Sequence, residues 1–326
     1  MALGLGMSAS AQEADLGPIT LYNGQHKDAT IALIEAFTAA TGVEVIERDG
    51  ASPELAHQIV EEGARSPADL IYTEDASPLY MLAGAGLLAP IDPDAIAAIP
   101  AEYRDAGGLW TGVLARSRVV VYNPGLIAES DLPASIHDLV SPEWQDRFAF
   151  VPTSGAFQAQ LSAMIKIDGR DAALAWLRGI TETGTVYGKN SLALDAVERG
   201  EIPFALINNY YWDGMVRERG IENVASRLHF FGTHDLGEML SVAGMGILAS
   251  STHQEAANAF IAFATGVEGQ TILADMSNQY PLNPEVATPP TLKPFSELTP
   301  PSGTLDLGEF SDGAAAVELL EEAGLL

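Results

Sequence analysis

The chain has 326 residues, of which 47% are hydrophobic, and it carries 44 acidic against 16 basic side chains for a net charge of -28. A length above about 250–300 residues exceeds the usual size of one hydrophobic core, so we expect two lobes. The acidic excess argues against a nucleic-acid partner, because a phosphate backbone would be repelled. Cysteine is absent, which excludes disulfides, iron–sulfur clusters and thiolate zinc sites.

The sequence indicates export without membrane insertion. Its longest apolar run, 81–90, is far shorter than the roughly 20 residues that a membrane-spanning helix needs. The first residues are small and apolar, and Ala9-Ser10-Ala11 fits an A-x-A cleavage site. We therefore interpret 1–11 as the remnant of a signal peptide, with a disordered N-terminal arm as the alternative. Export without a cysteine for lipid anchoring indicates the periplasm of a Gram-negative bacterium.

The first third of the chain alternates strands and helices. Helix 27–41 is predicted from the apolar stripe Ile31, Ile34 and Phe37, and Gly42 ends it. Strands are expected at 19–22, 43–47 and 68–73, and further helices between Ser52 and Gly63 and from Ser77 onward. Strand and helix alternating at this spacing predict β-α-β units with a parallel sheet.

After a Pro-, Ala- and Gly-rich stretch at 91–112 with a short helix, a second set of units follows. Strands are expected at 118–122, 148–151, 185–187, 204–207, 228–231 and 240–249, and helices at 156–167, 171–177, 192–199, 212–218, 254–265, from 268 and at 314–323. The expected fold class is α/β, with two lobes that each have a central, mostly parallel sheet flanked by helices.

Two tyrosines are adjacent at Tyr210 and Tyr211, directly after a short apolar strand and two asparagines. Neighbouring side chains of a strand point to opposite faces, whereas both phenols can converge at a strand-to-helix corner, with Asn208 or Asn209 as the helix N-cap. Two phenolate oxygens near one point would suit a hard, highly charged cation such as ferric iron. The alternative is an aromatic wedge that packs between two layers of the fold.

Three strand-to-helix corners in the second half of the chain carry small or amide residues. They are Thr153-Ser154-Gly155-Ala156, Asn190-Ser191 and Asn208-Asn209. The free N–H groups at a helix start can hold an anion, and such corners lie beyond the carboxyl ends of the strands, where ligands bind. Ordinary N-capping is the alternative explanation for each corner taken alone.

His26 and Glu74 follow the first and third predicted strands, so both are expected to face the same cleft. Each taken alone could equally be a helix cap or a surface residue. Together with the tyrosine pair they would supply four protein ligands from two lobes, and an anion on the helix starts could complete an octahedral site. The other histidines have no strand-end context and are interpreted as structural or solvated.

Five segments occur in an order and at a spacing typical of one protein family. They are YNGQH at 22–26, ADLIYTE at 68–74, RSRVVVY at 116–122, TSGAF at 153–157 and LINNYYW at 206–212. From about residue 19 to 326 the chain resembles the periplasmic ferric-iron-binding proteins, the bacterial transferrins of Fe(III) ABC importers. The resemblance implies a type II periplasmic-binding fold with two β crossovers at the hinge. We expect lobe 1 at 18–116 plus 242–290 and lobe 2 at 117–241 plus 291–326, with the ligand cleft between them.

The resemblance also implies the residues of the site. The metal ligands would be His26, Glu74, Tyr210 and Tyr211, and a synergistic phosphate would be held by Ser154, Gly155, Ala156, Asn190 and Asn208. Asp75 and Arg118 are expected beside the site in supporting roles. The partners would be the permease and ATPase subunits of an iron importer, and we expect a monomer.

The chain departs from the family pattern at Asp75, where a related protein has a glutamine that helps to hold the anion. A carboxylate cannot donate a hydrogen bond unless it is protonated, and it repels phosphate. The anion is therefore expected to bind more weakly, to be carbonate instead, or to be replaced by water.

Two rival functions remain open. A binding protein of the same fold could carry a polyamine, thiamine or an organic anion, although a polyamine site needs carboxylates and aromatic walls rather than adjacent phenols flanked by amides. A metal-dependent hydrolase could also use His, Glu and Tyr. The sequence contains no H-E-x-x-H, G-x-S-x-G or P-loop motif, so we expect no enzymatic activity.

Overall fold

The computed structural model describes residues 17–301 and 313–326, so the segment 1–11, expected to be a signal-peptide remnant, lies outside the described residues. The strands are β1 (Ile19–Asn23), β2 (Val45–Asp49), β3 (Leu70–Thr73), β4 (Leu88–Ala89), β5 (Trp110–Tyr122), β6 (Phe148–Phe150), β7 (Thr185–Val186), β8 (Phe204–Asn208), β9 (Arg227–His229), β10 (Leu240–Leu248) and β11 (Tyr280–Pro281). The α-helices are α1 (Lys27–Thr41), α2 (Ser52–Glu62), α3 (Ser77–Gly84), α4 (Gly155–Asp168), α5 (Arg170–Thr183), α6 (Asn190–Glu198), α7 (Asn209–Arg219), α8 (Gln254–Thr265), α9 (Val267–Ser277) and α10 (Ala314–Glu322). Within these described ranges, no helix is long and apolar enough to cross a membrane.

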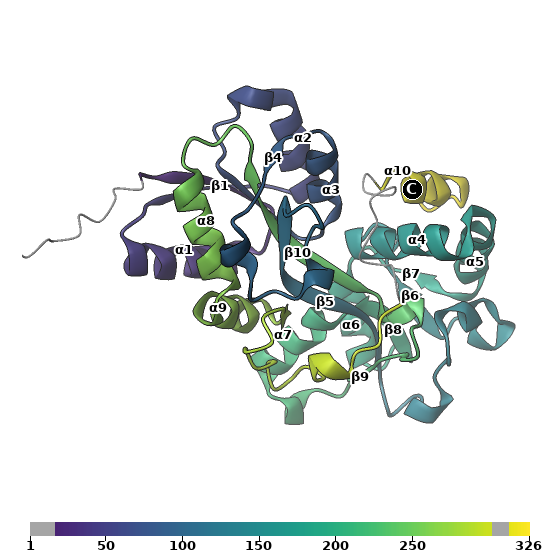
Figure 1. Cartoon of the computed structure of the whole chain (residues 1–326). Coiled ribbons are helices and arrows are strands. Elements are labelled where there is room, and N and C mark those ends of the chain that lie inside the picture. The colour runs from purple at the N-terminus through teal and green to yellow at the C-terminus, as the bar shows by residue number, and fades with distance from the viewer. Residues whose placement is uncertain (1–16, 302–312) are drawn as a thin grey trace, which may run out of the picture.

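The strands form one continuous mixed sheet in the order β2-β1-β3-β10-β5-β8-β6-β7. β1 pairs in parallel with β2 and β3, and β6 pairs in parallel with β7 and β8, as the predicted β-α-β units require. β10 and β5 lie antiparallel to each other between these two parallel groups. Figure 1 shows the groups as two halves of the molecule, with α1, α2, α3 and α8 around the first and α4, α5 and α6 around the second.

The strands place their side chains alternately in two cores, one on each face of the sheet. In β8, Phe204 and Leu206 belong to the core that contains residues of α4, α5 and α10. Ala205 and Ile207 belong to the core on the other face, under α6 and α7. Each fully buried large apolar side chain contributes roughly 1.5–3 kcal/mol, so these paired cores stabilise the position of β8 in the sheet.

β5 is the strand that joins the two halves. Up to Ser117 it pairs with β10, and from Arg118 onward it pairs with β8. The sequence predicted a strand only at 118–122, and this was wrong because the strand already begins at Trp110. All its residues are buried, so the first part lacks the apolar–polar alternation that marks a strand. Gly112 also interrupts the pattern, and it is needed because a Cβ there would lie 2.7 Å from a backbone oxygen.

Most other predicted elements form close to their expected bounds. α1 and α8 have the predicted bounds, and α1 ends because Gly42 adopts a φ of 77° and its N–H donates to the carbonyl of Thr38. β2 begins two residues later than predicted, at Val45, because pairing with β1 starts there. The side chain of Val43, predicted to open the strand, instead packs in the core beneath α1.

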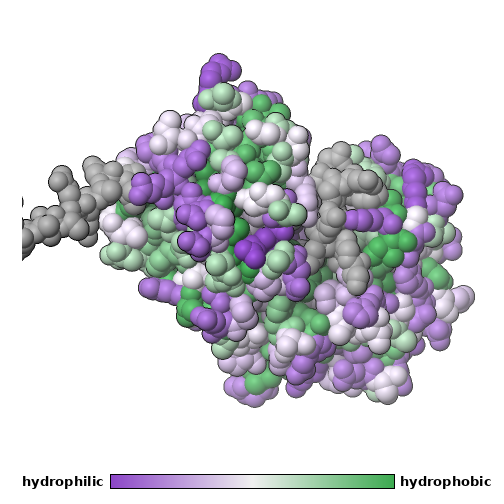
Figure 2. All heavy atoms as spheres, viewed as in Figure 1, coloured by the Kyte–Doolittle hydropathy of each residue, from purple (hydrophilic) through white to green (hydrophobic). Residues whose placement is uncertain are grey.

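The surface shown in Figure 2 carries hydrophilic residues over both halves of the molecule. Among the coloured residues of this face, hydrophobic side chains gather only in small groups between them. Among the residues that the structure describes, this face therefore presents no extended apolar patch.

Candidate functional site

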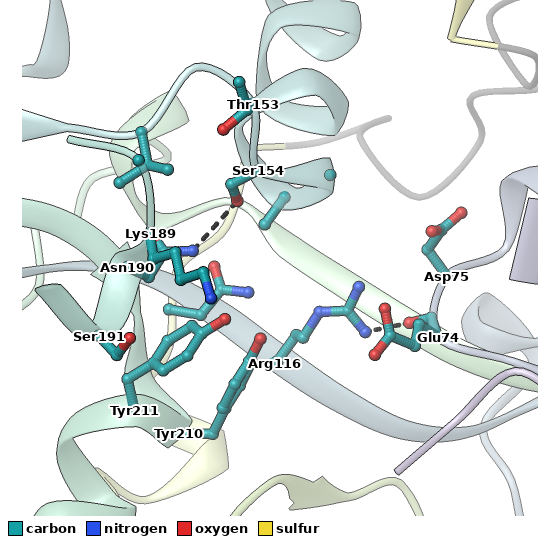
Figure 3. A pocket seen from close by; sticks show the side chains of 15 residues that line it. Glu74, Asp75, Arg116, Thr153, Ser154, Lys189, Asn190, Ser191, Tyr210 and Tyr211 are labelled. Atoms are coloured by element: carbon teal, nitrogen blue, oxygen red, sulfur yellow. Dashed lines mark hydrogen bonds between the residues drawn. The ribbon is translucent and has the colours of Figure 1, made fainter. Parts of the chain in front are cut away.

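The tyrosine pair stands on the first turn of α7, immediately after β8. Asn208 ends the strand with an extended backbone (φ -93°, ψ 149°), and the helix begins at Asn209. This change of conformation turns both phenols to one side, so the ring centroids of Tyr210 and Tyr211 lie 4.4 Å apart. Figure 3 shows the two hydroxyl ends directed into the same space. The corner predicted from the sequence forms, and both rings line open cavities, while Tyr211 also packs against the core under α6 and α7.

His26 and Glu74 approach this pair from the first half of the molecule. Nε2 of His26 lies 3.8 Å from Oε1 of Glu74, and the imidazole meets the Tyr210 ring edge-on with centroids 5.4 Å apart. Ser52 connects the two loops, because its hydroxyl donates to the carbonyl of Gly24 and accepts from the N–H of Glu74, both at 3.0 Å. The structure thus brings together the four residues predicted as metal ligands, two from each half.

Two cavities meet at the tyrosine rings. The first has a volume of about 310 Å³ and is lined by Glu74, Asp75, Arg116, Val151, Thr153, Ser154, Gly155, Ala156, Gly188, Lys189, Asn190, Ser191, Asn208, Tyr210 and Tyr211. The second, of about 620 Å³, is lined by His26, Glu74, Ser191, Leu194, Asp195, Tyr210, Tyr211, Gly214, Met215, Glu218 and Arg219. Glu74 and both tyrosines border each cavity, whereas His26 borders only the second. The predicted anion-binding residues all border the first.

The side chains at the three predicted corners are not used for helix capping. Ser154 and Asn208 occupy the N-cap positions of α4 and α7, yet neither side chain bonds to its own helix. Asn190 instead donates to the hydroxyl of Ser154 at 3.2 Å, as Figure 3 shows. Its amide oxygen and the amide nitrogen of Asn208 have no hydrogen-bond partner within the described residues. Ordinary N-capping therefore does not explain these residues, and they retain capacity for a ligand.

Two arginines of β5 reach the site, and sequence reasoning named only one of them. Arg118 is almost fully buried and donates to the side-chain oxygen of Asn208 at 3.1 Å, behind the cavity wall. Arg116 lines the first cavity, and its guanidinium donates to the backbone oxygen of Glu74. Figure 3 shows this guanidinium between Tyr210 and Glu74. The sequence signal that could have revealed Arg116 was its position two residues before Arg118 in an apolar run, since residues at alternate positions share one face of a strand.

Asp75 lies at the rim of the first cavity, where its carboxylate has a structural partner. Oδ1 accepts from the N–H of Ser77 at 2.9 Å, at the start of α3. Its backbone oxygen accepts from the Thr73 hydroxyl at 2.7 Å. The residue that departs from the family pattern is therefore anchored as an acceptor for α3, with its charge beside the cavity.

Comparison with known proteins assigns the chain to a family. Residues 32–299 match the bacterial extracellular solute-binding proteins. The chain belongs to this family. It is 41% identical over 326 residues to the "Major ferric iron-binding protein" of Neisseria meningitidis, covering 98% of this chain and 97% of the relative.

Solved structures give the same result for this solute-binding protein. Iron-bound HitA from Pseudomonas aeruginosa is 45% identical with a TM-score of 0.87, covering 94% of this chain and 99% of HitA. A Trichodesmium protein (IdiA, FutA) in complex with iron and citrate is 28% identical with a TM-score of 0.84, covering 95% and 100%. The family resemblance and the two-lobe fold predicted from the sequence are confirmed.

Burial controls the protonation of the site in this solute-binding protein. Burial lowers the pKa of His26, and the positive charge of Arg116 lowers it further, whereas the negative charge of Glu74 raises it. The net effect is a lowered pKa, so the imidazole is neutral at pH 7. Burial also raises the pKa of Tyr210, with Arg116 acting in the opposite direction. Within the described ranges, no group of three or more His, Asp or Glu side chains could hold a metal ion. A metal here would therefore depend on the tyrosines, whose phenols must lose their protons.

The orientation of α7 depends on a buried amide and a buried carboxyl. The side-chain oxygen of Asn209 accepts from the N–H of Ser117 in β5 at 2.9 Å. Its amide donates to Asp213 at 3.2 Å and to the carbonyl of Asn278 at 3.3 Å. Asn209, the other asparagine predicted as a possible N-cap, therefore ties the tyrosine-bearing turn to the strand that joins the halves.

Replacing Asp213 by asparagine should stabilise the iron-free protein at pH 8 and change little near pH 4. Burial raises the pKa of Asp213 to about 8, above its usual 3.8. As the pH rises, the unfolded chain ionises this group before the folded protein does. The contribution of Asp213 to stability therefore falls between about pH 4 and pH 8. Each pKa unit corresponds to about 1.4 kcal/mol, so Asp213→Asn should gain a few kcal/mol at pH 8. Urea denaturation at the two pH values measures this.

The matched control is Asp171→Asn, since Asp171 is exposed on α5. Destabilisation by Asp213→Asn at pH 8 would mean that the folded protein holds an ionised carboxylate at this position.

Proposed function

We propose that this protein captures Fe(III) as its cargo in the cleft and delivers it to an ABC permease. The observation that carries the proposal is the tyrosine pair, whose ring centroids are 4.4 Å apart and face His26 and Glu74 from the other half. Two phenolates, one carboxylate and one neutral imidazole form a hard donor set with a charge of -3, which balances Fe(III). The iron-binding relatives named above support this assignment.

The four protein ligands leave room in an octahedral shell for a small oxyanion, which we propose binds in the first cavity. Supporting this, the helix start at Gly155, the unpartnered amide nitrogen of Asn208 and the side chains of Lys189 and Arg116 border that cavity. A helix N-terminus and charged donors together favour an anion. Phosphate and carbonate both have the required chemistry.

Replacing Asp75 by asparagine should strengthen anion binding about tenfold, because it removes a negative charge from the cavity rim. Asparagine keeps a side-chain oxygen that can accept from the N–H of Ser77, so this bond at the start of α3 should remain. The measurement is the phosphate concentration that half-saturates the spectral change of the iron-loaded protein. Asp105→Asn is the control, since Asp105 accepts a similar backbone bond from Leu109 away from both cavities. An unchanged phosphate affinity in Asp75→Asn would remove Asp75 from the anion site.

The delivery cycle follows from the two-lobe fold. We propose a hinge between residues 116 and 117 and between 241 and 242, with lobe 1 comprising 18–116 plus 242–290 and lobe 2 comprising 117–241 plus 291–326. Supporting this, the pairing partner of β5 changes between Ser117 and Arg118.

Fe(III) would engage the phenolates of one lobe, and closure would bring up Glu74 and His26. The protein would act as a monomer in the periplasm without catalytic turnover, and its partners would be the permease and ATPase subunits of the importer.

A visible absorption spectrum before and after addition of ferric citrate tests the function. We expect a broad tyrosinate-to-iron charge-transfer band to develop as the protein fills. A protein that stays colourless and takes up no iron would contradict the proposal and favour a polyamine, thiamine or organic anion in the same cleft.

A further inference from the structure

One face of α7 contacts the first half of the molecule at two separate points. Near the start of the helix, the Tyr210 ring meets the His26 ring edge-on, with centroids 5.4 Å apart. In the last turn of α7, the guanidinium of Arg217 donates to the backbone oxygen of Asp275, near the end of α9. Figure 1 shows α9 beside α7. The interval from Tyr210 to Arg217 is close to two helical turns, so both side chains project from the same side of α7.

The end of α9 is suited to a positively charged partner. Carbonyl groups in the last turn of a helix lack intrahelical partners and form the negative end of the helix dipole. α9 has no basic residue in its last turn, and the N–H of Asn278 donates to the oxygen of Ala274. Arg217 therefore supplies from α7 a positive charge and a donor that α9 does not provide for itself.

The two contact points in the first half belong to elements that are packed together. His26 directly precedes α1, and Asp275 lies within α9. The two helices share one hydrophobic core, to which α1 contributes Phe37 and α9 contributes Leu273. A movement that separates α7 from His26 therefore also separates it from the end of α9.

The start of α7 is tied to the proposed hinge, whereas Arg217 lies farther along the helix. The side-chain oxygen of Asn209 accepts from the N–H of Ser117, where β5 changes its pairing partner. The helical rise places Arg217 about 12 Å beyond Asn209 along the axis of α7. A rotation of the lobes about this hinge therefore displaces the contact of Arg217 more than the bonds of Asn209.

We propose that Arg217 is a positioning residue for cargo retention, which bonds to the end of α9 when the lobes close and thereby holds Tyr210 beside His26. Arg217 borders neither cavity, so it acts only through the arrangement of the lobes. The contact should slow the release of Fe(III) and leave its capture by the open protein nearly unchanged. This inference rests on the proposed ferric cargo and on the proposed lobes, which place α7 and α9 on opposite sides of the hinge.

The experiment compares the full-length wild type with Arg217→Gln at pH 7 in one buffer. Loss of the charge-transfer band to an excess of chelator gives the release rate, and growth of the band on mixing with ferric nitrilotriacetate gives the capture rate. Release from Arg217→Gln should be about three- to tenfold faster, as for loss of one charged hydrogen bond at an exposed site, while capture changes less than about twofold. An equal or slower release, or equal effects on capture and release, would overturn the inference.

Arg217→Lys is the second variant, because an ammonium group can donate to the same carbonyl. It should release iron more slowly than Arg217→Gln, and release as fast as from Arg217→Gln would contradict the proposed role of the charge. Arg227→Gln is the matched control, since Arg227 also donates to backbone oxygens, those of Val224 and Ser226, but within one half of the molecule. It should capture and release iron as the wild type does.

A second measurement follows the lobes directly. The chain has no cysteine, so Asp171→Cys on α5 and Glu268→Cys on α9 provide unique attachment points for a pair of fluorescent dyes. Both residues are exposed and border neither cavity. Energy transfer should show a larger fraction of separated lobes in iron-loaded Arg217→Gln than in the iron-loaded wild type, and identical distributions would overturn the inference.

The two proposals fail in different ways. If the wild type takes up no Fe(III), the ferric function and this inference fail together. If the wild type takes up Fe(III) and Arg217→Gln releases it at the wild-type rate, the inference fails while the ferric function stands.

Discussion

Replacing Tyr211 by phenylalanine should lower Fe(III) affinity by more than about 100-fold, because loss of even an outer partner of a metal ligand typically costs about 10–100-fold. The substitution deletes one hydroxyl and keeps the ring, so its packing against Tyr210 should persist. The charge-transfer band should weaken greatly or disappear, since half of the phenolate donors are lost. Chelator competition and the visible spectrum measure the two effects.

Tyr210→Phe should cause a comparable loss, because the two phenols converge from consecutive positions on α7. Tyr80→Phe is the control, since Tyr80 packs against Trp110 in the first half and borders neither cavity. Near wild-type iron affinity in both site variants would show that phenolate ligation is not how this protein holds its cargo.

Iron affinity should fall steeply as the pH decreases, by about 100-fold per pH unit around neutrality if each phenol releases one proton. Burial raises the pKa of Tyr210 above its usual value of 10, so this phenol is protonated in the empty protein at pH 7. Binding must displace that proton, and lower pH favours the protonated, metal-free form. The protein is therefore expected to lose iron in acid.

Two measurements check this dependence. Ferric nitrilotriacetate competition between pH 6 and 8, corrected for protonation of the chelator, gives the slope. A pH indicator in weak buffer gives the number of protons released per iron, expected to be about two. Tyr210→Phe should release about one proton fewer and show a shallower slope. A flat profile in the wild type would exclude two neutral phenols as the ligands.

The loops that carry the proposed ligands were only partly predictable. The sequence placed His26 and Glu74 at strand ends, because strand and helix patterns on both sides are regular. It did not reveal that Ser52, at the start of α2, bonds to both loops. A serine before a proline was interpreted as a helix start alone, and its two partners lie 28 and 22 residues away in the chain.

The sequence by itself determined the order of the elements, the two sets of β-α-β units and the tyrosine pair at a strand-to-helix corner. These features depend on local periodicity and on the conformations of neighbouring residues, which the order of the amino acids displays directly. The first part of β5 was not predicted, because a strand whose residues are all buried lacks the alternation of apolar and polar residues that marks a half-exposed strand.

Only the tertiary structure decided the roles of the polar residues around the cavity. Asn208 faces the cavity while Asn209 ties α7 to β5, although the two are adjacent and chemically identical. Arg116 donates to the backbone oxygen of Glu74, which lies 42 residues earlier in the sequence. Such roles depend on which partner lies within hydrogen-bond distance, and for partners far apart in the sequence that distance exists only once the chain has folded.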